Sequence, residues 1–144
     1  MGTNNILSKV YEGLKDLTWY EMAPFGSRFI GCAEEDSDYD FLVLVDMRPS
    51  LHDMRSTNFC PDADDPLYGT YFSSWKDEAK QVNLVFTDDK EYYKATLEAR
   101  DFCKKYRVFD KSDRCKVHES FRDALIMPRK FNYANKITIG QAKG

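Results

Sequence analysis

The sequence contains no apolar run long enough to span a membrane, and its N-terminus lacks the apolar core of a signal peptide. We therefore expect a cytoplasmic protein without membrane contact. None of the four cysteines forms a Cys-x-x-Cys pair, which removes the usual redox and zinc-ribbon motifs. Hydrophobic residues make up 42% of the 144-residue chain, which predicts one folded domain rather than a disordered segment.

A zinc site would have to use Cys103, Cys115 and His118. Both cysteines fall on the apolar faces of predicted helices, where a cysteine behaves as a small hydrophobic residue. We expect His118 to be a core or boundary histidine, and we predict no structural zinc.

The stretch GSRFIGCAEEDSDYDFLVLVD, residues 26–46, carries the clearest functional signal. Asp38 and Asp40 open an apolar strand, and residues two apart in a strand point to the same face. Such a pair of carboxylates suits a divalent ion held against a triphosphate. Gly26 permits close backbone approach to a phosphate, and Ser27 adds a hydroxyl.

The same acids are also compatible with two other interpretations. A calcium loop beginning at Asp36 needs Gly and Glu where this chain has Phe41 and Met47, so it is rejected. A solvated acidic turn before a buried strand is the second alternative. It does not account for a Gly-Ser pair at a fixed distance upstream, so we favour the binding site.

The segment resembles the signature of the DNA polymerase β-like nucleotidyltransferase superfamily, which is Gly-Ser, a spacer of about ten residues and Asp-x-Asp. The likeness is to the minimal, single-domain members, and Arg28 and Ser37 also match residues common among them. Residues 69–125 are similar to small nucleotidyltransferases encoded by tailed bacteriophages. The resemblance implies a palm-like nucleotidyltransferase fold over residues 1–125.

The resemblance also implies a metal-dependent reaction that moves NMP from an NTP, by default ATP, to an acceptor hydroxyl. Asp38 and Asp40 would bind Mg²⁺, or Mn²⁺ in its place, and the nucleotide would contact Gly26, Ser27, Arg28 and Ser37. The acceptor would be a protein, an RNA or a small molecule. By analogy, the partner would be a second copy of the chain in a homodimer or a toxin protein. For a phage protein, it would be part of the host machinery in the host cytoplasm.

One position departs from the superfamily pattern. Its catalytic members carry a third acid on a neighbouring strand, and here the equivalent is Asn83. An amide oxygen can bind Mg²⁺, but it has no charge and cannot act as a base. Asn83 therefore keeps open a second function, a nucleotide-binding or protein-interaction protein with little or no catalysis.

The hydrophobic pattern predicts an α/β (α+β) domain, a small mixed β-sheet with helices packed on it. An N-terminal helix is expected, with Asn4 or Asn5 as its N-cap. The remaining expectations, in chain order, are strand Thr18–Pro24, helix Phe29–Ala33, strand Tyr39–Val45, a long connection 48–69 with a helical turn near Leu51–Arg55, strands Thr70–Trp75 and Gln81–Phe86 joined by the turn Lys76–Lys80, a helix capped by Asp88 or Asp89 with Tyr106 on its inner face, and a helix opened by Asp110 or Ser112.

The segment 126–144 differs from the rest in charge. It has four basic residues and no acid, whereas the whole chain has a net charge of −3. Phe131 and Tyr133 lie among these charges, a pattern compatible with nucleic acid or phosphate contact. A packed or frayed C-terminal segment is the alternative, which we favour because four charges make a weak patch.

Overall fold

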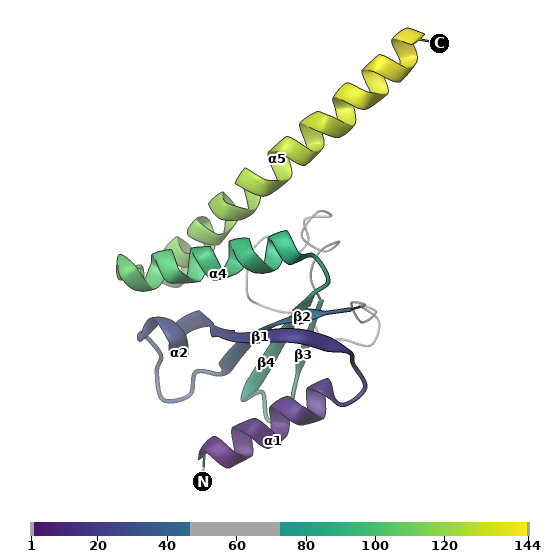
Figure 1. Ribbon diagram of the computed structural model, residues 1–144. Coiled ribbons are helices and arrows are strands. Elements are labelled where there is room, and N and C mark those ends of the chain that lie inside the picture. The colour runs from purple at the N-terminus through teal and green to yellow at the C-terminus, as the bar shows by residue number, and fades with distance from the viewer. Residues whose placement is uncertain (1, 47–72, 144) are drawn as a thin grey trace.

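The computed structural model describes residues 2–46 and 73–143, and these residues form four helices around a four-stranded mixed sheet (Figure 1). This is the α+β arrangement predicted from the sequence. In chain order the elements are α1 (Gly2–Leu14), β1 (Trp19–Phe25), α2 (Gly26–Ile30), β2 (Tyr39–Val45), β3 (Ser73–Lys76), β4 (Val82–Thr87), α4 (Lys90–Lys105) and α5 (Lys111–Lys143).

The strand order is β1-β2-β4-β3, so β4 lies between β2 and the edge strand β3. Strands β2 and β4 are parallel, and the two outer pairs are antiparallel. The registers align Phe25 with Asp40, Asp40 with Asn83, and Asn83 with Lys76. One row of residues thus crosses the whole sheet and contains an acid, an amide and an amine.

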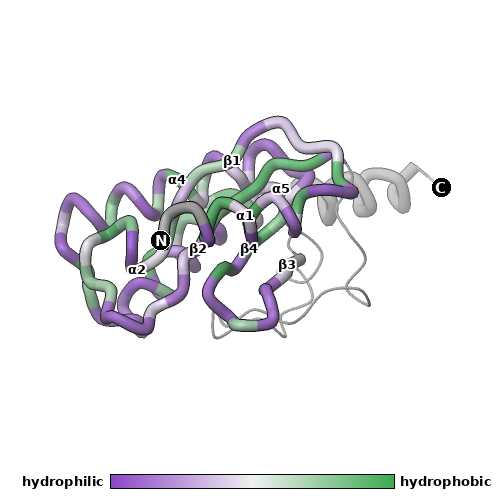
Figure 2. The backbone as a smooth tube through the Cα atoms, turned by 90° about the horizontal axis from the view of Figure 1, so that it is seen from below, coloured by the Kyte–Doolittle hydropathy of each residue, from purple (hydrophilic) through white to green (hydrophobic). Residues whose placement is uncertain are grey.

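Helices cover both faces of the sheet, with α1 on one face and α4 on the other (Figure 1). Alternate residues of β2 point to opposite faces: Val43 packs in the cluster with Val10 of α1, whereas Leu42 packs in the cluster with Tyr92 of α4. Hydrophobic residues therefore run continuously along the central strands, as Figure 2 shows. Asp40 has the alternation of Leu42, which places its side chain on the α4 face.

Several predicted boundaries shift in the structure. Strand Tyr39–Val45 is confirmed, but Asn4 and Asn5 lie inside α1, which begins at Gly2, so the predicted N-cap is wrong. An apolar stripe fixes the face of a helix but not its first residue. The segment 48–69, its predicted turn Leu51–Arg55 and residues 70–72 lie outside the described residues.

Lys76 belongs to β3 and not to the predicted turn. It pairs with Asn83 in the antiparallel ladder. A lysine is well tolerated in an edge strand, because its aliphatic stem lies along the sheet while its charge reaches a polar partner.

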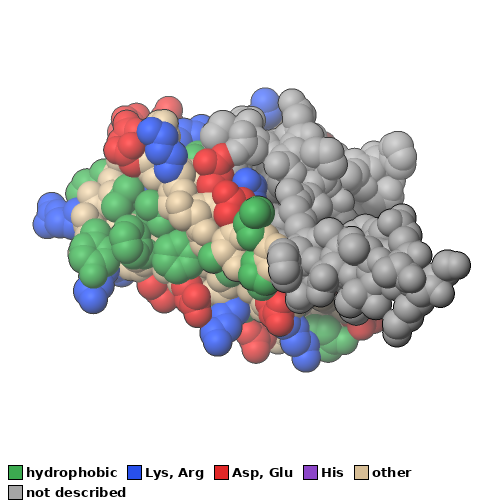
Figure 3. Space-filling model, turned by 90° about the horizontal axis from the view of Figure 1, so that it is seen from above, with side chains coloured by type: hydrophobic (Ala, Val, Ile, Leu, Met, Phe, Trp, Pro, Cys, Tyr) green, Lys and Arg blue, Asp and Glu red, His purple; other side chains and the backbone are tan. Residues whose placement is uncertain are grey.

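Asp89 caps α4, accepting hydrogen bonds from the amides of Glu91 and Tyr92 at 3.0 and 3.2 Å. Tyr106 was predicted to face inward and is instead 58% exposed, because α4 ends at Lys105. Its ring contacts that of Phe102, which in turn meets Phe121 of α5. Figure 3 shows hydrophobic side chains exposed on this side of the molecule, which is viewed from above.

Asp110 accepts a hydrogen bond from the amide of Asp113 and so caps α5, as predicted. Helix α5 continues through Pro128 and the basic segment to Lys143, and it projects away from the sheet (Figure 1). Within the described part of the chain, no helix combines the length and apolar character that crossing a bilayer requires.

Candidate functional site

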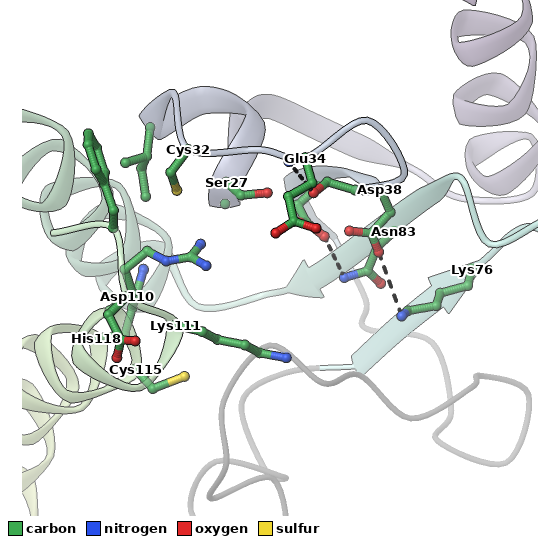
Figure 4. Close-up of a pocket in the computed structure, with 16 residues that line it drawn as sticks. Ser27, Cys32, Glu34, Asp38, Lys76, Asn83, Asp110, Lys111, Cys115 and His118 are labelled. Carbon is green, nitrogen blue, oxygen red and sulfur yellow. Dashed lines mark hydrogen bonds and ion pairs between the residues drawn. The ribbon is translucent and has the colours of Figure 1, made fainter. Parts of the chain in front are cut away.

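The row that crosses the sheet brings Asp40, one of the two predicted acids, next to Asn83. Asp40 is the second residue of β2, and Asn83 stands opposite it in β4. The Asn83 amide Nδ2 donates a hydrogen bond to Asp40 Oδ1 at 3.0 Å (Figure 4). The side-chain oxygen Oδ1 of Asn83 is buried and has no hydrogen-bond partner among residues 2–46 and 73–143. An unused buried acceptor therefore lies beside a carboxylate.

Gly26 closes the other side of Asp40. Its φ is +77°, and a Cβ at this position would lie 2.3 Å from Asp40 Oδ2. A side chain would therefore be both strained and in collision with the carboxylate, so glycine is required here. Helix α2 begins at Gly26, three residues before the predicted start, which puts Ser27 within the first turn of the helix.

Arg28 has a different position from the other predicted nucleotide contacts. Its guanidinium donates to the backbone oxygens of Ser37 at 2.7 and 3.2 Å and of Glu35 at 3.0 Å. It also lies over the ring of Tyr39, 4.5 Å from its centroid. Arg28 does not line the cavity described next; it holds the loop that leads to Asp38.

A cavity of about 490 Å³ opens between α2, the strand ends and the start of α5. Five of the predicted site residues line it together with Asn83: Gly26, Ser27, Ser37, Asp38 and Asp40. Ser37 Oγ also accepts a hydrogen bond from the amide of Glu34 at 2.9 Å. On this side the cavity thus gathers residues that lie as far apart in the chain as Gly26 and Asn83.

Helix α5 supplies the opposite wall. Lys111, Arg114, Cys115 and His118 all line the cavity, and their spacing places them on one face of the helix. Figure 4 shows Lys111, Cys115 and His118 across the cavity from Ser27 and Asp38. The sequence interpretation placed Cys115 and His118 inward but missed the two cations, although all four share one helical face.

Lys76 is the third cation that the sequence interpretation missed. Its ammonium Nζ lies 3.7 Å from Asp38 Oδ2, and the side chains of both residues are mostly shielded from solvent. Because Lys76 was assigned to a turn, no sequence signal connected it with the acids. In the structure it forms the end of the row that also contains Asp40 and Asn83.

One acid and the histidine of the cavity, Asp40 and His118, have perturbed pKa values. Burial, followed by the charge of Asp38, raises the pKa of Asp40 to about 7, against the opposing effects of Asn83, Lys76 and Arg114. Burial, assisted by the charge of Arg114, lowers the pKa of His118 to about 4, so this imidazole is neutral at pH 7. The cavity therefore contains one carboxyl that changes charge near neutral pH.

Oxygen ligands suitable for Mg²⁺ meet in this cavity. Asp38 and Asp40 offer carboxylates, and the unpartnered Oδ1 of Asn83 offers a neutral oxygen beside them. The described residues contain no group of three or more His, Cys, Asp or Glu with metal-site geometry. At this site the third oxygen would come from the Asn83 amide. The donor set fits a hard divalent ion with few protein ligands.

Comparison with protein-family models, curated proteins and solved structures finds no match for this chain.

Proposed function

We propose that this protein binds an NTP with Mg²⁺ in the cavity and transfers NMP to an acceptor hydroxyl, releasing pyrophosphate. The observation that supports this most directly is the juxtaposition of Gly26 and Ser27 with Asp38 and Asp40 around one cavity. These four residues are the Gly-Ser and Asp-x-Asp motifs of the resemblance to the minimal nucleotidyltransferases. The fold brings them together although they come from two separate elements and a loop.

The charges around the cavity suit a polyanion bound with a cation. Asp38 and Asp40 would hold the divalent ion, which on binding neutralises phosphate charge and polarises the α-phosphate. Lys111 and Arg114 line the same cavity from α5, and among the described residues neither takes part in an ion pair. Nε of Arg114 is buried and has no hydrogen-bond partner within the described part of the chain, so a phosphate oxygen would satisfy it.

In the proposed reaction the acceptor oxygen bonds to the α-phosphorus while the bond from that phosphorus to pyrophosphate breaks. Gly26 and Ser27 hold the departing phosphates, and the cavity contributes mainly positioning and electrostatics. Asn83 cannot accept the proton of the attacking hydroxyl, so the proton passes to water. A slow transfer follows from this.

A second function is favoured by one contact. The Asn83 amide donates to Asp40 where the resemblance implies a third carboxylate, which suits a protein that binds the nucleotide without efficient chemistry. Such a protein would act through a partner.

Labelled transfer separates the two functions. We would incubate the protein with α-labelled NTPs, Mg²⁺ or Mn²⁺ and a bacterial lysate, and then identify the labelled product.

Nucleotide binding itself is tested by calorimetry with each NTP and Mg²⁺. We expect Asp38→Ala and Asp40→Ala each to weaken metal-dependent binding by about ten- to a hundredfold, as loss of a charged ligand does. The matched control is Asp16→Ala, an exposed acid that does not line the cavity. Absence of heat and of a thermal shift with every nucleotide would refute the pocket assignment.

A further inference from the structure

Lys76 forms an ion pair with Asp38, one of the two predicted acids that line the cavity. Its ammonium lies 3.7 Å from Asp38 Oδ2, and only 16% of its side chain is exposed. The register sets Lys76 opposite Asn83, which in turn stands opposite Asp40. Trp75 packs against the cluster on the α1 face, so the side chain of Lys76 points to the face that carries the acids.

The row has a charge pattern unlike that of three carboxylates. Asp40 is an acid, Asn83 is neutral and Lys76 is a cation that reaches past Asn83 to Asp38 (Figure 4). With Asp38 included, the four side chains sum to one negative charge when both acids are ionised. Such a site attracts free divalent ions weakly, since metal affinity depends on how much ligand charge is available.

We propose that the Lys76 ammonium is a built-in cation that takes the place of a second metal ion at Asp38. The cavity then binds one divalent ion, which arrives with the nucleotide, and Lys76 itself contacts the polyphosphate when that ion draws Asp38 away. This inference rests on the proposed nucleotide binding. It assigns the metal-bound polyphosphate to Lys76 as its ligand. Asn83 is uncharged and cannot neutralise the charge of that ligand.

Alternative roles for Lys76 are less consistent with the geometry. A purely structural ion pair would not need to lie inside a cavity lined by Ser27 and Arg114 as well. Lys9 illustrates such a structural pair: it bonds Asp77 at 3.0 Å, and neither residue lines the cavity. The two pairs lie close together, because Lys76 is the last residue of β3 and Asp77 follows it. Of the two pairs, the one between Lys76 and Asp38 lines the cavity.

The experiment measures Mn²⁺ binding to the free protein, by the loss of the free-ion electron paramagnetic resonance signal, and NTP binding by calorimetry with and without Mg²⁺. The proteins are wild type, Lys76→Met, Lys76→Arg and the control Lys94→Met, which alters an exposed lysine of α4 outside the cavity. Removing a like charge near the ion should raise the Mn²⁺ affinity of Lys76→Met about tenfold or more. Metal-free NTP binding should weaken by a similar factor.

Lys76→Arg keeps the charge and should resemble wild type in Mn²⁺ affinity, as should Lys94→Met. If Lys76→Met does not fold, Lys76→Gln replaces it, because its amide keeps a polar end on the stem. An unchanged or lower Mn²⁺ affinity in a folded, NTP-binding Lys76→Met overturns the role of Lys76 while nucleotide binding stands. Failure of the folded wild type to bind NTP with Mg²⁺ overturns both.

Discussion

Asp40 has the most strongly perturbed acidity in the cavity, because burial and the adjacent Asp38 raise its pKa to about 7. In the unfolded chain an aspartate has a pKa of about 3.9. Between these two values the folded protein binds more protons than the unfolded chain does. The free energy of unfolding therefore decreases as the pH rises through this window, and ionised Asp40 destabilises the fold above pH 7.

We predict that Asp40→Asn increases the free energy of unfolding at pH 8 by about 1–2 kcal/mol, less than the full pKa shift implies because water screens a partly exposed group. The Asn side chain keeps an oxygen for the amide of Asn83, so that hydrogen bond survives. Urea unfolding at pH 5 and pH 8 measures the change.

At pH 5 the increase should be smaller, about a third of that at pH 8, because this pH lies near the lower end of the window, where the unfolded chain is ionised and folded Asp40 is still mostly protonated. Asp16→Asn, which changes an exposed acid, serves as the control and should leave the free energy of unfolding unchanged at both pH values. From pH 5 to pH 8 the free energy of unfolding of the wild type should decrease relative to that of Asp40→Asn. If it does not, the pKa of Asp40 is not raised.

At the scale of elements, α2 has only five residues and is bounded by two glycines with positive φ. Gly26 begins it at +77°, and Gly31 ends it at +96°. Only the first faces the site: a Cβ at Gly26 meets Asp40, whereas a Cβ at Gly31 has no atom within 4 Å. The two positions therefore separate backbone strain from crowding of the carboxylate.

We predict that Gly26→Ala and Gly31→Ala both lower stability by about 1–2 kcal/mol through the left-handed backbone. Gly26→Ala should in addition displace Asp40 and abolish Mg²⁺-dependent NTP binding, while Gly31→Ala should keep it. Urea unfolding and calorimetry on both variants test this. Equal nucleotide affinity in the two folded variants would show that the contact between Gly26 and Asp40 has no part in binding.

The sequence predicted β2 correctly because its apolar run is long and both of its faces are buried. It did not predict the start of α2, since a Gly-Ser pair is typical of a turn and the positive φ of Gly26 is set by the neighbouring strand. Short strands with polar ends are equally difficult. Ser73–Lys76 has few apolar residues, and Lys76 joins the ladder through its pairing with Asn83.

The candidate site was predictable to the extent that it is local. Gly26, Ser27, Asp38 and Asp40 lie within one short stretch, so spacing connects them. Lys111 and Arg114 reach the same cavity through the packing of α5 against α4, which no local pattern reports. Arg28 shows the converse: it lies within the motif, but its hydrogen bonds fix the loop backbone at Glu35 and Ser37.

At the scale of the whole molecule, strand order assembles the site. Asp40 and Asn83 are 43 positions apart in the chain, and they meet because β4 inserts next to β2. The edge strand β3 then adds Lys76 to the row, and α5 closes the cavity over it. Under the proposed function, the balance between NMP transfer and nucleotide binding alone would depend on the residue that β4 places at position 83.

Asn83→Asp tests that balance with the rest of the fold unchanged. A carboxylate at this position loses the hydrogen bond that Asn83 donates to Asp40 and gains a like-charge neighbour. Without metal we therefore expect lower stability, and with Mn²⁺ we expect tighter ion binding than in wild type. The added carboxylate also offers a proton acceptor near the attacking hydroxyl.

General-base assistance is worth about 10²–10⁴-fold, so labelled NMP transfer or pyrophosphate release should increase by at least the lower of these factors in Asn83→Asp. Asn83→Ala is the matched control, because it removes the amide without adding charge and should not accelerate transfer.

Lys76 should reduce the gain in Mn²⁺ affinity by pairing with the new acid. The double variant Asn83→Asp with Lys76→Met should therefore bind Mn²⁺ more tightly than either single variant. If Asn83→Asp alters neither metal affinity nor transfer while folding normally, Asn83 does not contribute to the site, and the row across the sheet is a structural feature alone.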